Sequence, residues 1–126
     1  MRYEQFSVGE LTVRAIKAPT EFTGTVTQTT NRSTGVTLNA YQGQITTDAT
    51  SLAVATEATF TVTNNKVNAN SIIVLSMTTP SSTGFSQPFV SKVQSGSFDI
   101  TLTNLHASTA DTSASVISFL VLNGNP

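Results

Sequence analysis

The sequence predicts an all-β protein: a single-domain β-sandwich of jelly-roll type, with about eight strands and an N-terminal arm. Short runs of alternating apolar and polar residues recur along the chain, separated by glycine, asparagine and proline turns. β-Branched and aromatic residues fill these runs, and such residues suit a pleated, half-buried surface. No run has the length and period of a long helix. The 126 residues are enough for one domain around one core.

Residues 1–24 differ from the rest and predict an arm that precedes a β-sandwich domain over residues 25–126. The run "VGELTVRAIKAP" has strand character until Ala18-Pro19 interrupts it, because proline cannot donate to a β-ladder. The aromatic side chains of Tyr3 and Phe6 stand in a segment too short to bury them alone. We therefore expect the arm to dock against the body or against a neighbouring molecule.

The domain is expected to begin with three short strands, within residues 25–31, 36–39 and 44–48. A period of two starts at residue 25, and glycine-containing turns separate the runs, which is typical of a meander. Gly35 in the first turn is free to take a positive φ. The segment 49–58 is expected to be a loop or a short helix.

Two further strands are predicted in the middle of the domain. Residues 59–64 alternate cleanly and place Phe60 and Val62 inward. Residues 71–79 contain four consecutive apolar residues, which predicts a buried central strand.

The last three strands are predicted over residues 89–96, 97–104 and 115–123, the final one central because it is strongly apolar. The segments "FTVTN" and "DITLTN" share a polarity pattern and a closing asparagine, Asn64 or Asn104, which supports a two-sheet plan. Phe60, Phe98 and Phe119 are expected in the core.

Composition excludes several classes of function. Charged residues make up 10% of the chain and the net charge is -1, whereas nucleic-acid binding needs clustered Lys and Arg. No apolar run approaches the ~20 residues that cross a bilayer, so no membrane partner is expected. The absence of cysteine excludes disulfides and thiolate metal sites. The first ten residues carry acids where a signal peptide would be apolar, which predicts a soluble protein used without export.

The domain is poorer in charge than a typical free monomer, about a quarter of whose residues are charged. Beyond residue 24 the charged residues are Arg32, Asp48, Glu57, Lys66, Lys92, Asp99 and Asp111. Low charge gives weak protection against association, so we expect much of the surface to meet other protein chains. The alternative is a surface that stays soluble on serine and threonine hydroxyls alone.

No residue pattern predicts catalysis, a cofactor or a metal ion. His106 has Ser108 and Asp111 nearby in sequence, but no motif frames them as a base and a nucleophile. The aspartates are too dispersed for a calcium loop. Glu57 and Asp99 are a conceivable carboxylate pair. We expect that the protein is not an enzyme.

Two aromatic residues in predicted loops are candidate contacts. Tyr41 lies in a turn, where it would stack on a sugar or on a neighbouring subunit. Phe85 lies in the loop "STGFSQP" and would either anchor a partner or fold back onto the core.

The run "GTVTQTTNRSTGVTLNAYQGQITT", followed by "ATFTVTN", resembles small structural proteins of tailed bacteriophages. The matching residues are Gly24, Val26, Thr27, Gln28, Thr30, Thr34, Val36, Thr37, Leu38, Asn39, Gly43, Ile45, Thr46, Phe60, Thr61, Val62, Thr63 and Asn64. The likeness extends from residue 24 to about residue 126; its first run is specific in residue order, and its later strands match in style.

The resemblance implies a virion component, made in the host cytoplasm and placed on the capsid surface. We expect a capsid decoration (cement) protein, a homotrimer that stabilises the head by bridging subunits of the major capsid protein. The arm would lie on the shell, with Tyr3, Phe6 and Leu11 filling grooves. The resemblance implies no catalytic residues.

Two other hypotheses remain open. The chain would otherwise be a receptor-binding or adhesive module of a head or tail fibre, with sugar recognition by loops 39–43 and 80–88. An enzyme such as a polysaccharide hydrolase ranks last, because hydrolases usually need a cleft with two carboxylates.

Overall fold

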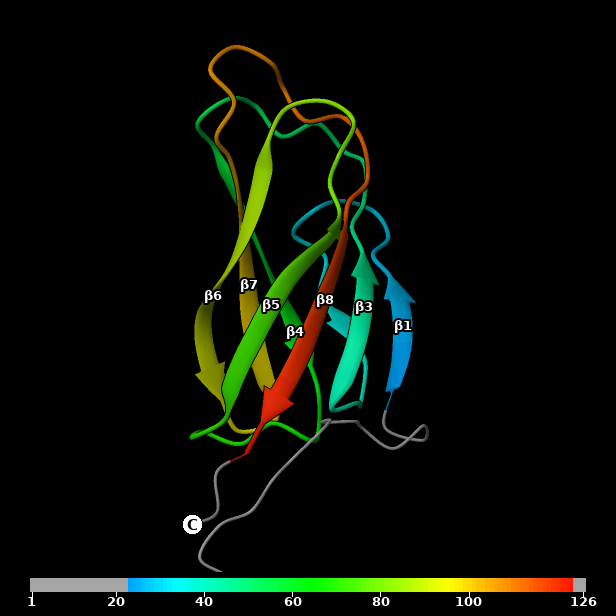
Figure 1. Ribbon diagram of the computed structural model, residues 1–126, viewed down its shortest axis with the longest axis vertical. Helices are drawn as coiled ribbons and strands as arrows, with labels where there is room; N and C mark the ends of the chain where they lie inside the picture. The colour runs from blue at the N-terminus through cyan, green and yellow to red at the C-terminus, as the bar shows by residue number, and fades with distance from the viewer. Residues whose placement is uncertain (1–22, 124–126) are drawn as a thin grey trace, which may run out of the picture.

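The computed structural model describes residues 23–123, which form two four-stranded sheets packed face to face (Figure 1). The strands are β1 (Thr23–Thr27), β2 (Val36–Thr37), β3 (Gln42–Thr46), β4 (Glu57–Thr63), β5 (Ile72–Thr79), β6 (Ser86–Gln94), β7 (Ser97–Asn104) and β8 (Val116–Leu122). The prediction of an all-β sandwich with about eight strands is confirmed. The described part of the chain contains no helix, and so none that could span a membrane.

The strand order is β1-β3-β8-β5 in the front sheet of Figure 1 and β2-β4-β7-β6 in the sheet behind it. Neighbouring strands are antiparallel, except that β1 pairs with β3 and β2 with β4 in parallel. The expected meander of the first three strands is therefore wrong. Parallel neighbours cannot be joined by a tight turn, and the chain passes through β2 in the opposite sheet between β1 and β3.

The run at 71–79 is not the buried central strand that its apolar residues predicted. It forms β5, an edge strand whose side chains alternate between the core and solvent. Ile73 and Leu75 pack against the core, whereas Ile72 and Val74 are exposed. The final strand, β8, lies between β3 and β5 and is central, as predicted.

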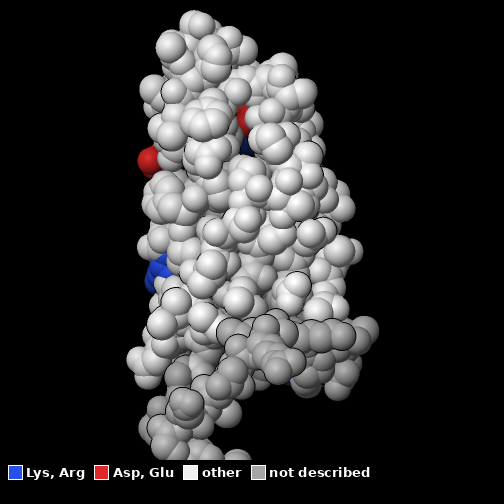
Figure 2. All heavy atoms as spheres, in the orientation of Figure 1, with Lys and Arg blue, Asp and Glu red and all other residues white. Residues whose placement is uncertain are grey.

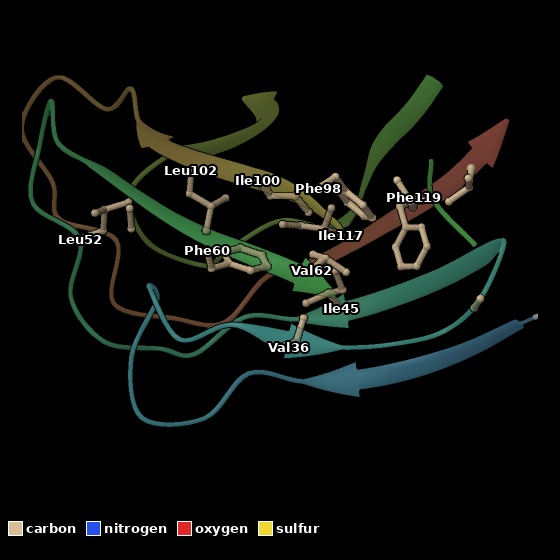
Figure 3. Close-up of a cluster of buried hydrophobic side chains, with 14 residues drawn as sticks. Val36, Ile45, Leu52, Phe60, Val62, Phe98, Ile100, Leu102, Ile117 and Phe119 are labelled. Carbon is tan, nitrogen blue, oxygen red and sulfur yellow. The ribbon is translucent and has the colours of Figure 1, made fainter. Parts of the chain in front are cut away.

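The core lies between the two sheets and is built from alternate residues of their strands (Figure 3). Phe98 of β7 and Phe119 of β8 meet across it, with ring centroids 5.4 Å apart and planes at 63°. Edge-to-face contact is a favoured geometry for aromatic rings. Phe60 is also buried, so the predicted core assignment of these three phenylalanines is confirmed.

Three buried amide side chains stand where strands end, and each holds a neighbouring loop. Asn64 follows β4 and bonds both backbone groups of Ala40, accepting from its N–H at 3.2 Å and donating to its carbonyl at 2.7 Å. Asn104 ends β7 and donates to the carbonyls of Leu52 and Thr109. Gln28 follows β1 and donates to two carbonyls of the next loop. The repeated strand-ending asparagine thus marks two loop anchors.

The remaining local predictions have different outcomes. Residues 49–56 are a loop in which Leu52 forms an isolated bridge with Asp111, whereas Glu57 and Ala58 already belong to β4. The expectation for Gly35 is wrong: within the β1–β2 connection the positive φ, 71°, belongs to Thr30. The first strand begins at residue 23, so the last two residues of the predicted arm, Thr23 and Gly24, belong to β1. Residues 1–22 of the predicted arm lie outside the described residues.

Candidate interaction surface

Among residues 23–123, the outer face of the β1-β3-β8-β5 sheet carries no charged side chain. Along these strands, alternate residues point away from the core. The outward residues are Thr23, Thr25, Thr27, Gln42, Gln44, Thr46, Ile72, Val74, Ser76, Thr78, Val116, Ser118, Leu120 and Leu122. Figure 2 shows this side of the molecule, where atoms of Lys, Arg, Asp and Glu appear in only a few places.

The β5 side of this face is aliphatic. Strand register places Ile72 beside Leu122 and Val74 beside Leu120, and we call these four residues the aliphatic cluster. Ile72, Val74 and Leu122 are 63%, 46% and 41% exposed. A shallow hollow of about 250 Å³ adjoins the cluster and includes Val74 and Leu120 in its lining.

The β1 side of the same face is polar without charge. A shallow groove of about 250 Å³ runs over β1, β3 and β8, with outward Gln42, Gln44 and Ser118 in its lining. Gln44 Nε2 donates to Ser118 Oγ at 3.3 Å. Amides and hydroxyls both donate and accept hydrogen bonds, so the groove suits a neutral polar partner.

The opposite sheet differs because its outer face carries Glu57, Lys92 and Asp99. Its threonines form a hydroxyl chain: Thr59 lies 2.7 Å from Thr101, which donates to Ser91 at 2.8 Å. A hydroxyl has one proton, so Thr59 donates to Thr101. Thr61 and Thr103 donate to Asp99 and Glu57. These threonines therefore serve as strand formers whose hydroxyls bond to side chains of neighbouring strands.

A buried ion pair fastens the loops at one end of the sandwich. Arg32 Nη2 donates to Asp111 Oδ1 at 3.0 Å, and the two side chains are 3% and 0% exposed. Arg32 also donates to the carbonyls of Thr50 and Ser113. Gly84 packs on Asp111, since a Cβ at Gly84 would lie 2.8 Å from the Asp111 backbone. Four connecting segments meet at this pair, which sequence reasoning missed because no local motif links residues 79 positions apart.

The two predicted loop contacts occupy different surroundings. Phe85 is 51% exposed, and its backbone is fixed, donating to Asn104 Oδ1 and accepting from Leu105 N–H. Tyr41 is half-buried against the core, with Lys66 Nζ 5.8 Å from its ring centroid. The arm residues Tyr3, Phe6 and Leu11 lie outside the described residues.

The titratable residues considered for chemistry are dispersed. His106 Nδ1 accepts backbone N–H bonds from Ser108 and Thr109 and so closes its own loop. Glu57 and Asp99 are four register positions apart, about 13 Å along the strands, beyond the separation of glycosidase carboxylates. Among residues 23–123 no cluster of three His, Cys, Asp or Glu side chains could hold a metal ion.

Asp48 has the one clear pKa shift among the described residues. Hydrogen bonds from the Thr50 hydroxyl, and then from the Thr50 backbone N–H, lower the pKa of Asp48 below its ordinary value of 3.8. These bonds form a local turn. The shift therefore reflects loop structure.

No protein-family model, curated protein or solved structure matches this chain.

Proposed function

We propose that this chain is a structural protein of a tailed-bacteriophage virion, a decoration protein that binds the capsid surface and bridges major capsid subunits. The observation that carries the proposal is the uncharged outer face of the β1-β3-β8-β5 sheet, with exposed aliphatic residues on one side. The residue pattern of the run 24–64, which resembles small virion proteins of tailed phages, supports it.

The proposed mechanism is mechanical. A decoration protein adds binding free energy at joints between capsid subunits, and the sum opposes the pressure of packaged DNA. Burial of apolar surface contributes roughly 25 cal/mol per Å², so small contacts repeated over a shell give a large total. Tyr3, Phe6 and Leu11 of the arm would fill grooves of the shell, and the sandwich would meet its symmetry mates as a homotrimer.

The arrangement of titratable groups supports a role without catalysis. Asp111 is committed to Arg32, and His106 Nδ1 to backbone N–H groups. Glu57 and Asp99 each accept a hydrogen bond from a threonine of the neighbouring strand. No nucleic acid, membrane or cofactor enters the proposal.

Deletion of residues 1–20 tests the capsid proposal. The truncated chain is expected to keep its β-sheet circular dichroism and thermal transition and to lose co-sedimentation with heads of the phage that encodes it. The full chain is the matched control and should sediment with the heads. Equal binding by the truncated chain would show that the arm is not needed for attachment. Absence of binding by the full chain would contradict the role on the capsid.

A second candidate, an adhesive module of a fibre, is favoured by the neutral groove over β1, β3 and β8. A glycan array probed with the full chain tests it. Reproducible binding that is lost in Gln44→Ala or Tyr41→Ala, with heads left unbound, would replace the decoration role by this one.

A further inference from the structure

The four sheet edges differ in their protection against pairing with another strand. β1 is five residues long and β2 only two. β6 carries Pro88, Lys92 and a register shift between Val90 and Lys92. Short edges, lysine, proline and bulges are the usual devices that prevent edge-to-edge association. β2 and β6 therefore have a recognisable protection, and β1 is the shorter of the two uncharged edges.

The fourth edge, β5, has little. It is eight residues long, without charge or proline, and its register shift lies only at its far end, between Met77 and Thr79. A long uncharged edge presents free backbone donors and acceptors to any extended chain.

The aliphatic cluster lies beside this edge. Ile72 and Val74 belong to β5 itself, and Leu120 and Leu122 belong to the adjoining strand β8. Of the six large hydrophobic residues exposed in the described chain, the cluster contributes Ile72, Val74 and Leu122. Exposed apolar residues that gather in one place mark interaction sites, whereas scattered ones are ordinary.

We infer that copies of this chain associate with one another through the β5 edge and the aliphatic cluster. The inference rests on the proposed function and adds a second contact to it: pairing of two identical β5 edges is a two-fold contact, so it joins copies from neighbouring trimers and not the copies within one trimer. Symmetry brings identical surfaces together, and like charges directly opposite repel. The outer face around β5 has no charge, so a second copy meets it without repulsion.

The absence of charge on this face also indicates that its partner is a second copy of the chain. A neutral face offers no charge complementarity to an acidic or basic partner, while an edge strand needs another edge strand. A second copy supplies both an unprotected edge and an equal aliphatic cluster. Close approach of two β5 strands satisfies backbone groups along the edge. It also places the two aliphatic clusters side by side on one continuous outer face, where Ile72 and Val74 of the two copies shield part of each other's apolar surface.

Single-cysteine crosslinking tests the contact, and the chain suits it because it has no native cysteine. Opposed residues of paired strands have Cα atoms about 4.5–5.5 Å apart, within the range that a disulfide spans. Val74→Cys and Ser76→Cys are the test variants. Thr25→Cys, on β1 at the other edge of the same face, is the control. Under mild oxidation we expect covalent dimers from at least one test variant and few from the control.

A charge-insertion pair gives the second measurement. Ile72→Lys combined with Val74→Lys places charge on exposed positions, and circular dichroism should report an unchanged fold. Light scattering should find at least tenfold weaker association than for the unmodified chain, whereas Thr25→Lys should associate normally. The inference is overturned if the unmodified chain is monomeric at about 100 μM, a concentration that populates contacts with micromolar dissociation constants. It is also overturned if the β5 variants associate or crosslink no differently from the controls.

Failure of this inference and failure of the proposed function have different signatures. A chain that associates through β5 but never binds heads supports the inference and removes the decoration role. A chain that binds heads as a monomer retains the decoration role and overturns the inference.

Discussion

At the scale of single residues, buried amides take the place of regular hydrogen bonding where strands end. Gln28, Asn64 and Asn104 each use their carbonyl and amino groups on backbone atoms of nearby loops. An amide can do this because it is both donor and acceptor. Leucine or alanine at these positions would leave buried backbone groups without partners.

Asn104→Ala is expected to lower the free energy of unfolding by about 3 kcal/mol, because several buried backbone groups lose a partner at once. Urea denaturation measures the change. Asn65→Ala, at an exposed position directly after Asn64, is the matched control and should stay within about 0.5 kcal/mol of the unmodified chain. Equal effects of the two substitutions would contradict the anchoring role of Asn104.

The Arg32–Asp111 pair predicts strong coupling. Arg32→Met and Asp111→Leu should each cost about 3–5 kcal/mol, because each leaves one buried charge alone. The double variant should cost clearly less than the sum, since it leaves neither charge. Denaturant melts of the four chains complete the cycle. Additivity within about 0.5 kcal/mol would mean that the two side chains act independently.

At the scale of elements, close packing beneath the outer face depends on residues without side chains. A Cβ at Gly43 of β3 would lie 2.6 Å from Leu38 Cδ2 and 2.7 Å from Phe119 Cε2. Both distances are far below van der Waals contact. Gly43 thus lets Leu38 and the Phe119 ring pack directly on the sheet backbone.

Gly43→Ala is therefore expected to destabilise the protein by about 1–3 kcal/mol through overpacking. Thermal unfolding followed by circular dichroism measures it. The control is Gln44→Ala, one residue along on the exposed face, where the loss should be within about 0.5 kcal/mol. A neutral effect of Gly43→Ala would show that Leu38 and Phe119 can move aside freely.

The alternation of residues was enough to predict most strands but not their neighbours. Phe60, Phe98 and Phe119 are in the core as the period of two predicts. The apolar run of β5 led to the wrong prediction of a central strand. Four successive apolar residues are compatible with a strand buried on both faces and also with an edge strand that exposes every second residue. Whether a strand is central or at an edge depends on long-range pairing. β5 is an edge because it pairs with β8 alone, a strand about 40 positions further along the chain.

At the scale of the whole molecule, the scarcity of charge is sharper in the structure than in the composition. Two of the seven charged residues of the described chain, Arg32 and Asp111, are buried against each other. Glu57, Lys92 and Asp99 lie on one sheet, so the other presents a neutral face. The sequence predicted a contact-prone surface; the choice of face required the strand order.

Self-association through that face should depend little on salt. We expect the dissociation constant to change by less than about threefold between roughly 0.05 and 0.5 M sodium chloride, because screening acts only on charges. Sedimentation velocity over a dilution series measures it at each salt concentration. A weakening of tenfold or more would point to ion pairs, and hence to the opposite sheet.

The central position of β8 has a consequence for synthesis. It follows all the other described strands along the chain, yet it alone joins β3 to β5. Until β8 has emerged, β3 and β5 have no common partner, so a chain that stops before β8 cannot complete the front sheet over the core. Closure of the core therefore depends on residues that are synthesised after all the other described strands.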